Sequence, residues 1–290
     1  MKIILGAAQF GSSYGIANRS GKVSDEDIRK ILKEAIKYGV DTIDTAVNYG
    51  DSERRLGKNN LNKFKVISKL PSINKIDTND LQKWILESVN NSLSQLKVNK
   101  LEALLLHRPQ ELLSDKGYLI IKALDYLKKN NLINKTGISI YDPNELPILF
   151  DKYKFELVQS PLNIMDRRII ESGWLEKLKD NNVEVHARSI FLQGLLLMEY
   201  KDLKNDFFKK NKFLRRWFDW LQINNLSPYE SSLEFIKTNQ LIDKFLIGVD
   251  NFNQFQELLE NYKADNYKFQ IPNFKCDDQN LLNPSKWPIL

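Results

Sequence analysis

Four polar side chains stand where apolar, strand-like runs end. Asp44, Lys69 and His107 each close such a run, and Tyr49 lies in the loop just behind Asp44. In a parallel barrel these residues would meet at one rim, because such sites are built from the carboxyl ends of the strands and the loops that follow them. The spacing therefore predicts a candidate site with acid/base groups.

Each residue taken alone also has an ordinary structural explanation. An Asp at a strand end often caps a turn, a loop Tyr often only packs, and a single His is more often a hydrogen-bonded core residue than a catalyst. Lys69 is less ordinary, because an unpaired ammonium is costly to bury, and Asp44 offers a counter-charge. Their joint placement on three consecutive strands favours a functional site.

Short apolar runs alternate with amphipathic helical stretches along the chain. Ser24 is typical of an N-cap before three acidic residues, and Gly39 is typical of a helix end. The strand-like runs are 3–5, 40–45, 64–68, 101–106, 136–140, 155–159, 183–187 and 245–249. Helical stretches are expected at 24–39, 81–96, 117–130, from about 143, 172–181, 203–224, 228–238 and 251–262.

This order predicts an α/β fold, a parallel (β/α)8 TIM barrel. Alternating strands and helices imply a parallel sheet, and eight units favour its closure. The 290 residues suit one barrel, which typically needs about 250. We expect one domain over 1–290, with an irregular tail from about 265 across the barrel surface, since Pro272, Pro284 and Pro288 follow there.

Composition narrows the setting of the protein. With 42% hydrophobic and 28% charged residues, the chain can bury a large core. The single cysteine, Cys276, makes no intramolecular disulfide, which favours a reducing compartment. With no signal peptide and no apolar segment of membrane-spanning length, we expect a cytoplasmic protein that binds no metal and no membrane.

The net charge of +6 is modest and dispersed. In the densest basic stretch, aromatic and aliphatic residues follow at helical spacing, which predicts a helix with a solvated basic face and a buried aromatic face. We therefore expect no nucleic-acid partner, although the basic residues could serve an anionic substrate. The stretch comprises Lys209, Lys210, Lys212, Arg215 and Arg216, followed by Trp217, Phe218, Trp220 and Leu221.

Three motifs together resemble the aldo-keto reductase family. They are Asp-Thr-Ala-x-x-Tyr-Gly at 44–50, Ser-Lys at 68–69 and Leu-Leu-His-Arg-Pro at 105–109. The resemblance runs from Gly6 to about Asn261. It implies a catalytic tetrad of Asp44, Tyr49, Lys69 and His107.

The family's chemistry is consistent with these residue types. Reducing a carbonyl needs a hydride donor and an acid for the oxygen, and a nicotinamide must supply the hydride because side chains cannot. Tyrosine has an ordinary pKa near 10, so a nearby cation is needed to ease proton transfer. The resemblance thus implies Tyr49 as acid/base, Lys69 lowering its pKa, Asp44 orienting Lys69, and His107 positioning the carbonyl oxygen.

The resemblance also implies cofactor-binding residues. Ser139 and Gln159 match positions that hold the nicotinamide carboxamide, and Arg188 stands where an aromatic ring usually stacks on the nicotinamide. A guanidinium plane can also stack. Further cofactor contacts are expected from Ser189, Gln193, Gly248, Val249, Asp250, Gln254 and Glu257. The resemblance implies NADPH as the cofactor. The family's Lys and Arg for a 2′-phosphate have no clear match here, which leaves NADH as the alternative.

Residues after the first strand are expected to line the pocket, namely Gln9, Phe10 and Tyr14. Ala-Gln-Phe-Gly at 8–11 and Tyr-Gly-Ile-Ala at 14–17 resemble short bacterial reductases linked to surface-sugar or polysaccharide biosynthesis. Because the first strand begins almost at once, we expect the family's N-terminal hairpin to be absent or much reduced. His186 lies within a strand, where a structural role is the favoured interpretation.

Three hypotheses follow. The first is an NAD(P)H-dependent reductase of an aldehyde, ketone or sugar carbonyl, acting as a monomer or weak homodimer. The second is a regulatory protein that binds NAD(P)H with little turnover. The third is a barrel isomerase or aldolase with Lys69 as a Schiff-base amine, against which Tyr49 and His107 argue.

Overall fold

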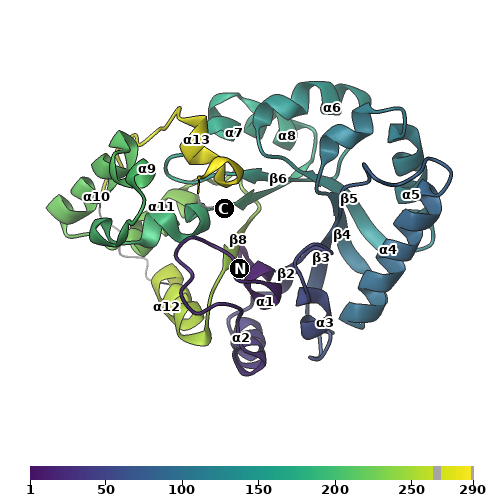
Figure 1. Cartoon of the computed structure of the whole chain (residues 1–290), viewed down its shortest axis with the longest axis horizontal. Helices are drawn as coiled ribbons and strands as arrows, with labels where there is room; N and C mark the ends of the chain where they lie inside the picture. Colours follow the sequence, from purple (N-terminus) through teal and green to yellow (C-terminus); the bar gives the residue numbers. More distant parts are fainter. Residues whose placement is uncertain (264–268, 289–290) are drawn as a thin grey trace.

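A computed structural model of the chain describes residues 1–263 and 269–288. Its eight parallel strands pair in sequence order and β8 returns to β1, so the sheet closes into a barrel (Figure 1). The predicted (β/α)8 barrel is therefore confirmed. The strands are β1 Ile3–Gly6, β2 Thr42–Asp44, β3 Lys65–Leu70, β4 Leu101–Leu106, β5 Ile133–Ser139, β6 Leu157–Pro161, β7 Glu184–Arg188 and β8 Lys244–Gly248.

Alternation along the strands separates the barrel interior from its outer core. A small apolar cluster contains Ile67, Leu105 and Leu157, while a much larger cluster joins the strands to the surrounding helices. Side chains two residues apart on a strand share a face. Lys69, His107 and Gln159 follow these three residues by two positions, so they lie on the inner side at the carboxyl rim.

Helices surround the barrel (Figure 1). The N-cap and C-terminal signals of α2 are confirmed, since the Ser24 side chain accepts from the Asp27 amide and Gly39 has φ +74°. The other α-helices are α1 Ala8–Gly11, α3 Ser52–Leu56, α4 Leu81–Leu96, α5 Gly117–Lys129, α6 Leu146–Lys152, α7 Arg168–Glu171, α8 Trp174–Asp180, α9 Asp206–Lys209, α10 Lys212–Asn224, α11 Pro228–Thr238, α12 Phe252–Lys263 and α13 Gln279–Leu282, with α2 at Asp25–Lys37.

The helical stretch expected over 203–224 is not continuous. It divides into α9 and α10, because Asn205 and Asn211 each cap a new helix through their side-chain oxygens. Within α10, Leu214, Trp217, Phe218 and Leu221 are buried, as the amphipathic pattern predicted. None of the described helices is long and apolar enough to cross a membrane.

The tail returns to the carboxyl rim of the barrel. Asp265, where we expected it to begin, lies outside the described residues, but 269–288 contain two short helical turns, α13 and η5 Pro284–Lys286. Phe274, Leu281 and Trp287 of this segment are buried. In Figure 1, α13 (yellow) lies next to α7, far from it in sequence, and Gln279 accepts a hydrogen bond from Arg168 at 2.9 Å.

Candidate active site

A cavity of about 600 Å³ opens at the carboxyl rim, and all four residues of the predicted tetrad line it. Each comes from a strand end or from the loop behind one, as the sequence predicted. Asp44 ends β2, Lys69 lies near the end of β3, His107 directly follows β4, and Tyr49 lies between β2 and α3. The fold thus brings together residues separated by up to 63 positions.

Asp44 and Lys69 form a buried ion pair at the base of the cavity. Both residues are 1% exposed, and the Lys69 ammonium donates to the Asp44 carboxylate and to the Thr45 carbonyl at 3.0 Å. Burial lowers the pKa of Lys69, and the Asp44 charge opposes that shift. The other Asp44 oxygen accepts from Gln159 Nε2 at 2.6 Å, so the carboxylate holds both the lysine and the glutamine.

Tyr49 is held by a turn that packs closely on α1. A Cβ at Gly11 would lie 1.6 Å from the Tyr49 carbonyl oxygen, and a Cβ at Gly50 would lie 2.3 Å from the Gly11 carbonyl oxygen. Gly50 also has φ +58°, a conformation that favours glycine. Gly11 and Gly50 therefore allow the backbones of α1 and of the Tyr49 turn to come close, and this contact fixes Tyr49 at the rim.

The Tyr49 hydroxyl stays protonated at neutral pH. Burial is the main reason that its pKa lies well above the ordinary value of 10, and the Asp44 charge raises it further, while Arg188 opposes the shift. The Lys69 ammonium lies 5.0 Å from the ring centroid and is already paired with Asp44. Burial and the Asp44 charge therefore outweigh the lowering expected from Lys69, and that role of Lys69 stays a prediction.

His107 faces Tyr49 as a neutral imidazole. The two rings meet edge to face with centroids 6.0 Å apart. Burial lowers the pKa of His107 to about 3, and the cations Lys69, Arg188 and Arg108 lower it in the same direction. A neutral imidazole keeps one donor and one acceptor nitrogen, so it can hydrogen-bond a carbonyl oxygen without contributing a charge.

The residues predicted to hold the nicotinamide carboxamide fit that group. Gln159 is fully buried, and its Oε1 has no hydrogen-bond partner among the described residues, although it lies in the cavity wall. Ser139 pairs with Gln159 across β5 and β6 and lines the same wall. A carboxamide would supply the donor that Oε1 lacks, so the polar groups present here suit the ligand.

Arg188 ends β7 and projects into the cavity lining. Its guanidinium donates to the Ile140 carbonyl at 2.7 Å and to the Ser189 hydroxyl at 3.2 Å, and lies 4.7 Å from the Tyr141 ring centroid. The loop behind it is strained, since Ser189 and Gln193 have φ of 58° and 54°. Such conformations cluster at ligand-binding sites.

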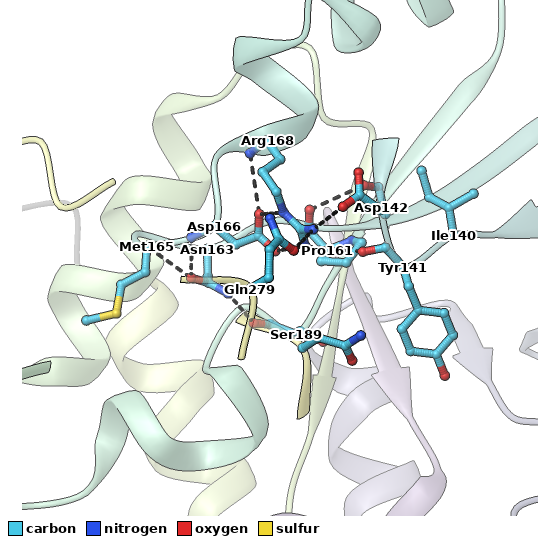
Figure 2. Close-up of polar contacts among 12 residues, drawn as sticks. Ile140, Tyr141, Asp142, Pro161, Asn163, Met165, Asp166, Arg168, Ser189 and Gln279 are labelled. Atoms are coloured by element: carbon cyan, nitrogen blue, oxygen red, sulfur yellow. Dashed lines mark hydrogen bonds and ion pairs between the residues drawn. The ribbon is translucent and has the colours of Figure 1, made fainter. Parts of the chain in front are cut away.

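A second arginine, Arg168, bonds the loops that lie behind the cavity wall of Tyr141 and Arg188. Figure 2 shows Arg168 reaching Asp166, Asp142 and Gln279, with bonds of 2.7–2.9 Å to their oxygens. Its Nη2 also donates to the Tyr141 carbonyl at 3.1 Å. The network joins the loops after β5 and β6 to the tail, while the Tyr141 ring points away from it in the figure.

Most of the predicted ligand-binding residues line the cavity. Those that do are Gln9, Tyr14, Ser139, Gln159, Arg188, Ser189, Gln193, Gly248, Asp250 and Gln254. Gln9 packs on Gly248, where a Cβ would lie 2.5 Å from its Oε1. Phe10, Val249 and Glu257 are not among the lining residues, because Phe10 and Val249 are buried in the core and Glu257 is exposed on α12.

Some lining residues were not predicted from the sequence. They include Asn18, Arg19, Tyr141, Tyr229, Pro284 and Ser285. Tyr141 comes two residues after Ser139 at a strand end, a position that could have indicated it. Pro284 and Ser285 carry no such signal, because only the return of the tail brings them to the rim.

His186 does not line this cavity, and its contacts are those of a structural residue. It is 1% exposed, and its Nε2 lies 2.8 Å from the Glu184 carboxylate. Lys135 bonds the same carboxylate at 2.7 Å and also pairs with Glu102 at 3.1 Å. These contacts join β4, β5 and β7 near their amino-terminal ends, away from the tetrad.

Fold and rim geometry together define a (β/α)8 enzyme whose candidate acid/base groups share one cavity with the polar wall of Ser139 and Gln159. The family model narrows this class, since the Aldo/keto reductase family matches residues 2–271. The chain belongs to that family and is an NAD(P)-dependent oxidoreductase.

Known proteins similar to this chain agree with that assignment. The uncharacterised oxidoreductase YqkF of Bacillus subtilis (strain 168) is 27% identical over 274 residues, which cover 88% of this chain and 87% of the relative. The holo form of an aldo-keto reductase from Bacillus halodurans aligns with a TM-score of 0.68 at 19% identity, covering 91% of this chain and 87% of that one. The glycerol dehydrogenase of Gluconobacter oxydans aligns with a TM-score of 0.65 at 19% identity, covering 90% and 86%.

Proposed function

We propose that this protein reduces an aldehyde, ketone or sugar carbonyl with Tyr49 as the acid. The observation that carries the proposal is the position of the Tyr49 hydroxyl in the cavity wall beside neutral His107 and the paired Lys69. No hydrogen bond within 1–263 and 269–288 occupies that hydroxyl. It is thus available to a substrate oxygen.

In the proposed reduction each residue of the site has a separate role. A nicotinamide held by Gln159 and Ser139 would supply the hydride that the carbonyl carbon needs. Tyr49 carries its proton at neutral pH and delivers it to the carbonyl oxygen, while His107 holds that oxygen through a neutral imidazole nitrogen. Lys69 lies close enough to the ring to stabilise the tyrosinate that remains, and Asp44 keeps the ammonium in place.

The choice between the two nicotinamide cofactors turns on the 2′-phosphate. The family resemblance favours NADPH, which we propose as the preferred donor. One observation favours the alternative. The first turn of α12, Phe252 to Gln254, contains no Lys or Arg that could bind a 2′-phosphate, and NADH lacks that phosphate. Titration with both reduced cofactors decides between them.

A sugar carbonyl suits the outer part of the cavity. Tyr14 and Gln193 hydrogen-bond each other there at 3.2 Å, and Gln193 Oε1 has no partner among the described residues. Asn18 and Arg19 lie in the same wall. Polar groups of this kind can exchange bonds with sugar hydroxyls, so we propose a substrate used in surface-sugar or polysaccharide biosynthesis. We further propose a monomer or weak homodimer, which sedimentation would distinguish.

The test begins with cofactor titration followed by nicotinamide fluorescence, and continues with small aldehydes and reducing sugars. Replacing Tyr49 by Phe should leave cofactor binding intact and lower turnover by about 100-fold or more, the usual contribution of a general acid. Tyr118→Phe is the matched control, because Tyr118 is 66% exposed on α5 and lies outside the cavity.

Three outcomes separate the hypotheses. Oxidation of the reduced cofactor that depends on Tyr49 and not on Tyr118 supports the reductase. Tight binding without oxidation by any carbonyl favours the NAD(P)H-binding regulatory protein. If neither reduced cofactor binds at millimolar concentration, the proposal is wrong.

A further inference from the structure

Arg188 brings to the cavity a positive charge that no ion pair within the described residues offsets. Three Lys or Arg side chains line it, and two of them are paired, Lys69 with Asp44 and Arg19 with Asp202 at 3.4 Å. Arg188 makes no ion pair with any residue in the described part of the chain. Its bonds go to a carbonyl and a hydroxyl, which are neutral.

The charge is also fixed in position. The Ile140 carbonyl holds Nη2, the Ser189 hydroxyl holds Nη1, and the Tyr141 ring covers one side at 4.7 Å. The Nε atom is buried and has no partner among the described residues. A guanidinium held on several sides cannot swing into solvent to reduce its electrostatic effect.

Nearby carboxylates are engaged elsewhere. Glu145 is close enough for the Arg188 charge to act on its pKa, but its carboxylate accepts from the backbone amides of Tyr141 and Asp142 at 2.7 and 2.8 Å. Asp142 itself pairs with Arg168 at 2.7 Å. Neither forms an ion pair with Arg188, and Asp250, which also lines the cavity, hydrogen-bonds Gln9 and Gln254 instead. The guanidinium therefore has no paired carboxylate among the described residues.

Arg188 and Gln159 project into the same cavity from neighbouring strands. In the register of β6 and β7, Gln159 pairs with His186 and Pro161 pairs with Arg188. Arg188 therefore lies two residues nearer the carboxyl rim than the partner of Gln159, on the same face of the sheet. A nicotinamide whose carboxamide meets Gln159 would therefore lie beside the guanidinium. The oxidised ring carries a positive charge and the reduced ring is neutral.

From this juxtaposition we propose that Arg188 makes the site discriminate between the two redox forms of the cofactor, holding the reduced form more tightly than the oxidised form. The proposal rests on the proposed nicotinamide site at Gln159. Two like charges in a partly desolvated cavity repel, whereas a neutral ring meets no such cost. Reduced cofactor is then retained, and oxidised cofactor is released once a carbonyl has been reduced.

The effect is a ratio of two dissociation constants. For the wild-type protein we expect the oxidised form to bind at least about tenfold more weakly than the reduced form, given the size of short-range charge interactions. A tenfold ratio corresponds to a shift of about 30 mV in the two-electron potential of the bound cofactor. Because only binding is measured, the result does not depend on finding the substrate.

The experiment measures both constants by calorimetry with the NADPH/NADP⁺ and NADH/NAD⁺ pairs. Arg188→Met removes the charge and keeps an unbranched side chain, whereas Arg188→Lys keeps the charge. Arg108→Met is the matched control, because Arg108 also lies over the Tyr141 ring, at 5.8 Å, but is exposed and does not line the cavity. Circular dichroism checks that each variant is folded.

We expect the ratio to fall about tenfold in Arg188→Met and to stay near the wild-type value in Arg188→Lys and Arg108→Met. An unchanged ratio in folded Arg188→Met, or a wild-type protein that binds both forms equally, overturns the inference and leaves the reductase proposal standing. Should Arg188→Met fail to fold, a ratio well below wild type in Arg188→Lys also overturns it. If the wild-type protein binds neither form, the proposed function itself fails.

Discussion

Tyr49, Lys69 and His107 owe their protonation states to their surroundings rather than to their ordinary chemistry. Burial raises the pKa of Tyr49 and lowers the pKa of Lys69 and His107, in each case by disfavouring the charged form. The Asp44 carboxylate limits the shift at Lys69. The site therefore holds one paired ammonium, one neutral imidazole and one phenol that keeps its proton, which suits the carbonyl reduction that we propose.

The pKa of His107 has a consequence for stability. Its folded value of about 3 lies below the ordinary value of 6.5, so the unfolded chain takes up the proton first as the pH falls. The contribution of neutral His107 is thus complete above about pH 6.5 and is lost progressively toward pH 3. Urea unfolding of the wild type and of His107→Gln should show this difference.

Between pH 7 and pH 5 we expect the wild type to lose more unfolding free energy than His107→Gln, since the variant lacks the titrating group. Equal losses in the two proteins would mean that folding does not lower the pKa of His107.

Short elements, rather than the strands, set the position of the tyrosine. The α1 turn and the loop before α3 touch through backbone atoms at Gly11 and Gly50. The Ser52 hydroxyl also donates to the Ala7 carbonyl at 2.8 Å and links the same two segments. Because the contact is between backbones, it cannot relax by rotating a side chain.

Gly11→Ala should therefore displace the turn that carries Tyr49. We expect a loss of about 1–3 kcal/mol in unfolding free energy from overpacking, and a fall in turnover of tenfold or more from misplacement of the acid. Gly39→Ala is the control, because a Cβ there meets nothing within 4 Å and only the positive φ opposes it. It should cost about 1–2 kcal/mol without changing turnover. Full turnover in Gly11→Ala would show that the turn does not fix the position of Tyr49, the proposed acid.

The carboxyl rim is completed by segments from both ends of the chain. The loop of Tyr14 to Arg19 and the tail turn at Pro284 line one cavity with the strand ends. Packing of Phe274 and Trp287 against the helix side chains Trp217 and Phe208 secures the tail. The Cys276 amide adds a bond to the Met165 carbonyl at 3.0 Å, so the tail belongs to the folded core.

The reactivity of the Cys276 thiol measures how firmly the tail packs on the barrel. Cys276 is 2% exposed, and burial raises the pKa of its thiol to about 11, so the reactive thiolate is scarce at pH 8. A thiol reagent should label the native protein much more slowly than the urea-unfolded protein, in which the single cysteine reacts in full. Rapid labelling of the native protein would show that the tail leaves the barrel readily. Trp287→Ala, which removes an anchor of the tail, should accelerate the reaction.

The sequence by itself determined the closed barrel and the four residues at its rim. Alternation of strand and helix patterns is local information, and a residue at the end of an apolar run lies at the rim wherever the run is a barrel strand. Caps were also local, as Ser24 and Gly39 show. The prediction for 203–224 was wrong because the capping signals at Asn205 and Asn211 were not weighed against the helical period.

Only the tertiary structure decided the electrostatics and the outer wall of the site. Whether Lys69 lowers the pKa of Tyr49 depends on how much water the surrounding chain excludes and on the pairing with Asp44, neither of which is a property of sequence spacing. The same holds for the unpaired charge of Arg188 and for Pro284 at the rim. Desolvation and charge pairing are sums over neighbours from distant parts of the chain, and those neighbours exist only once the barrel has closed.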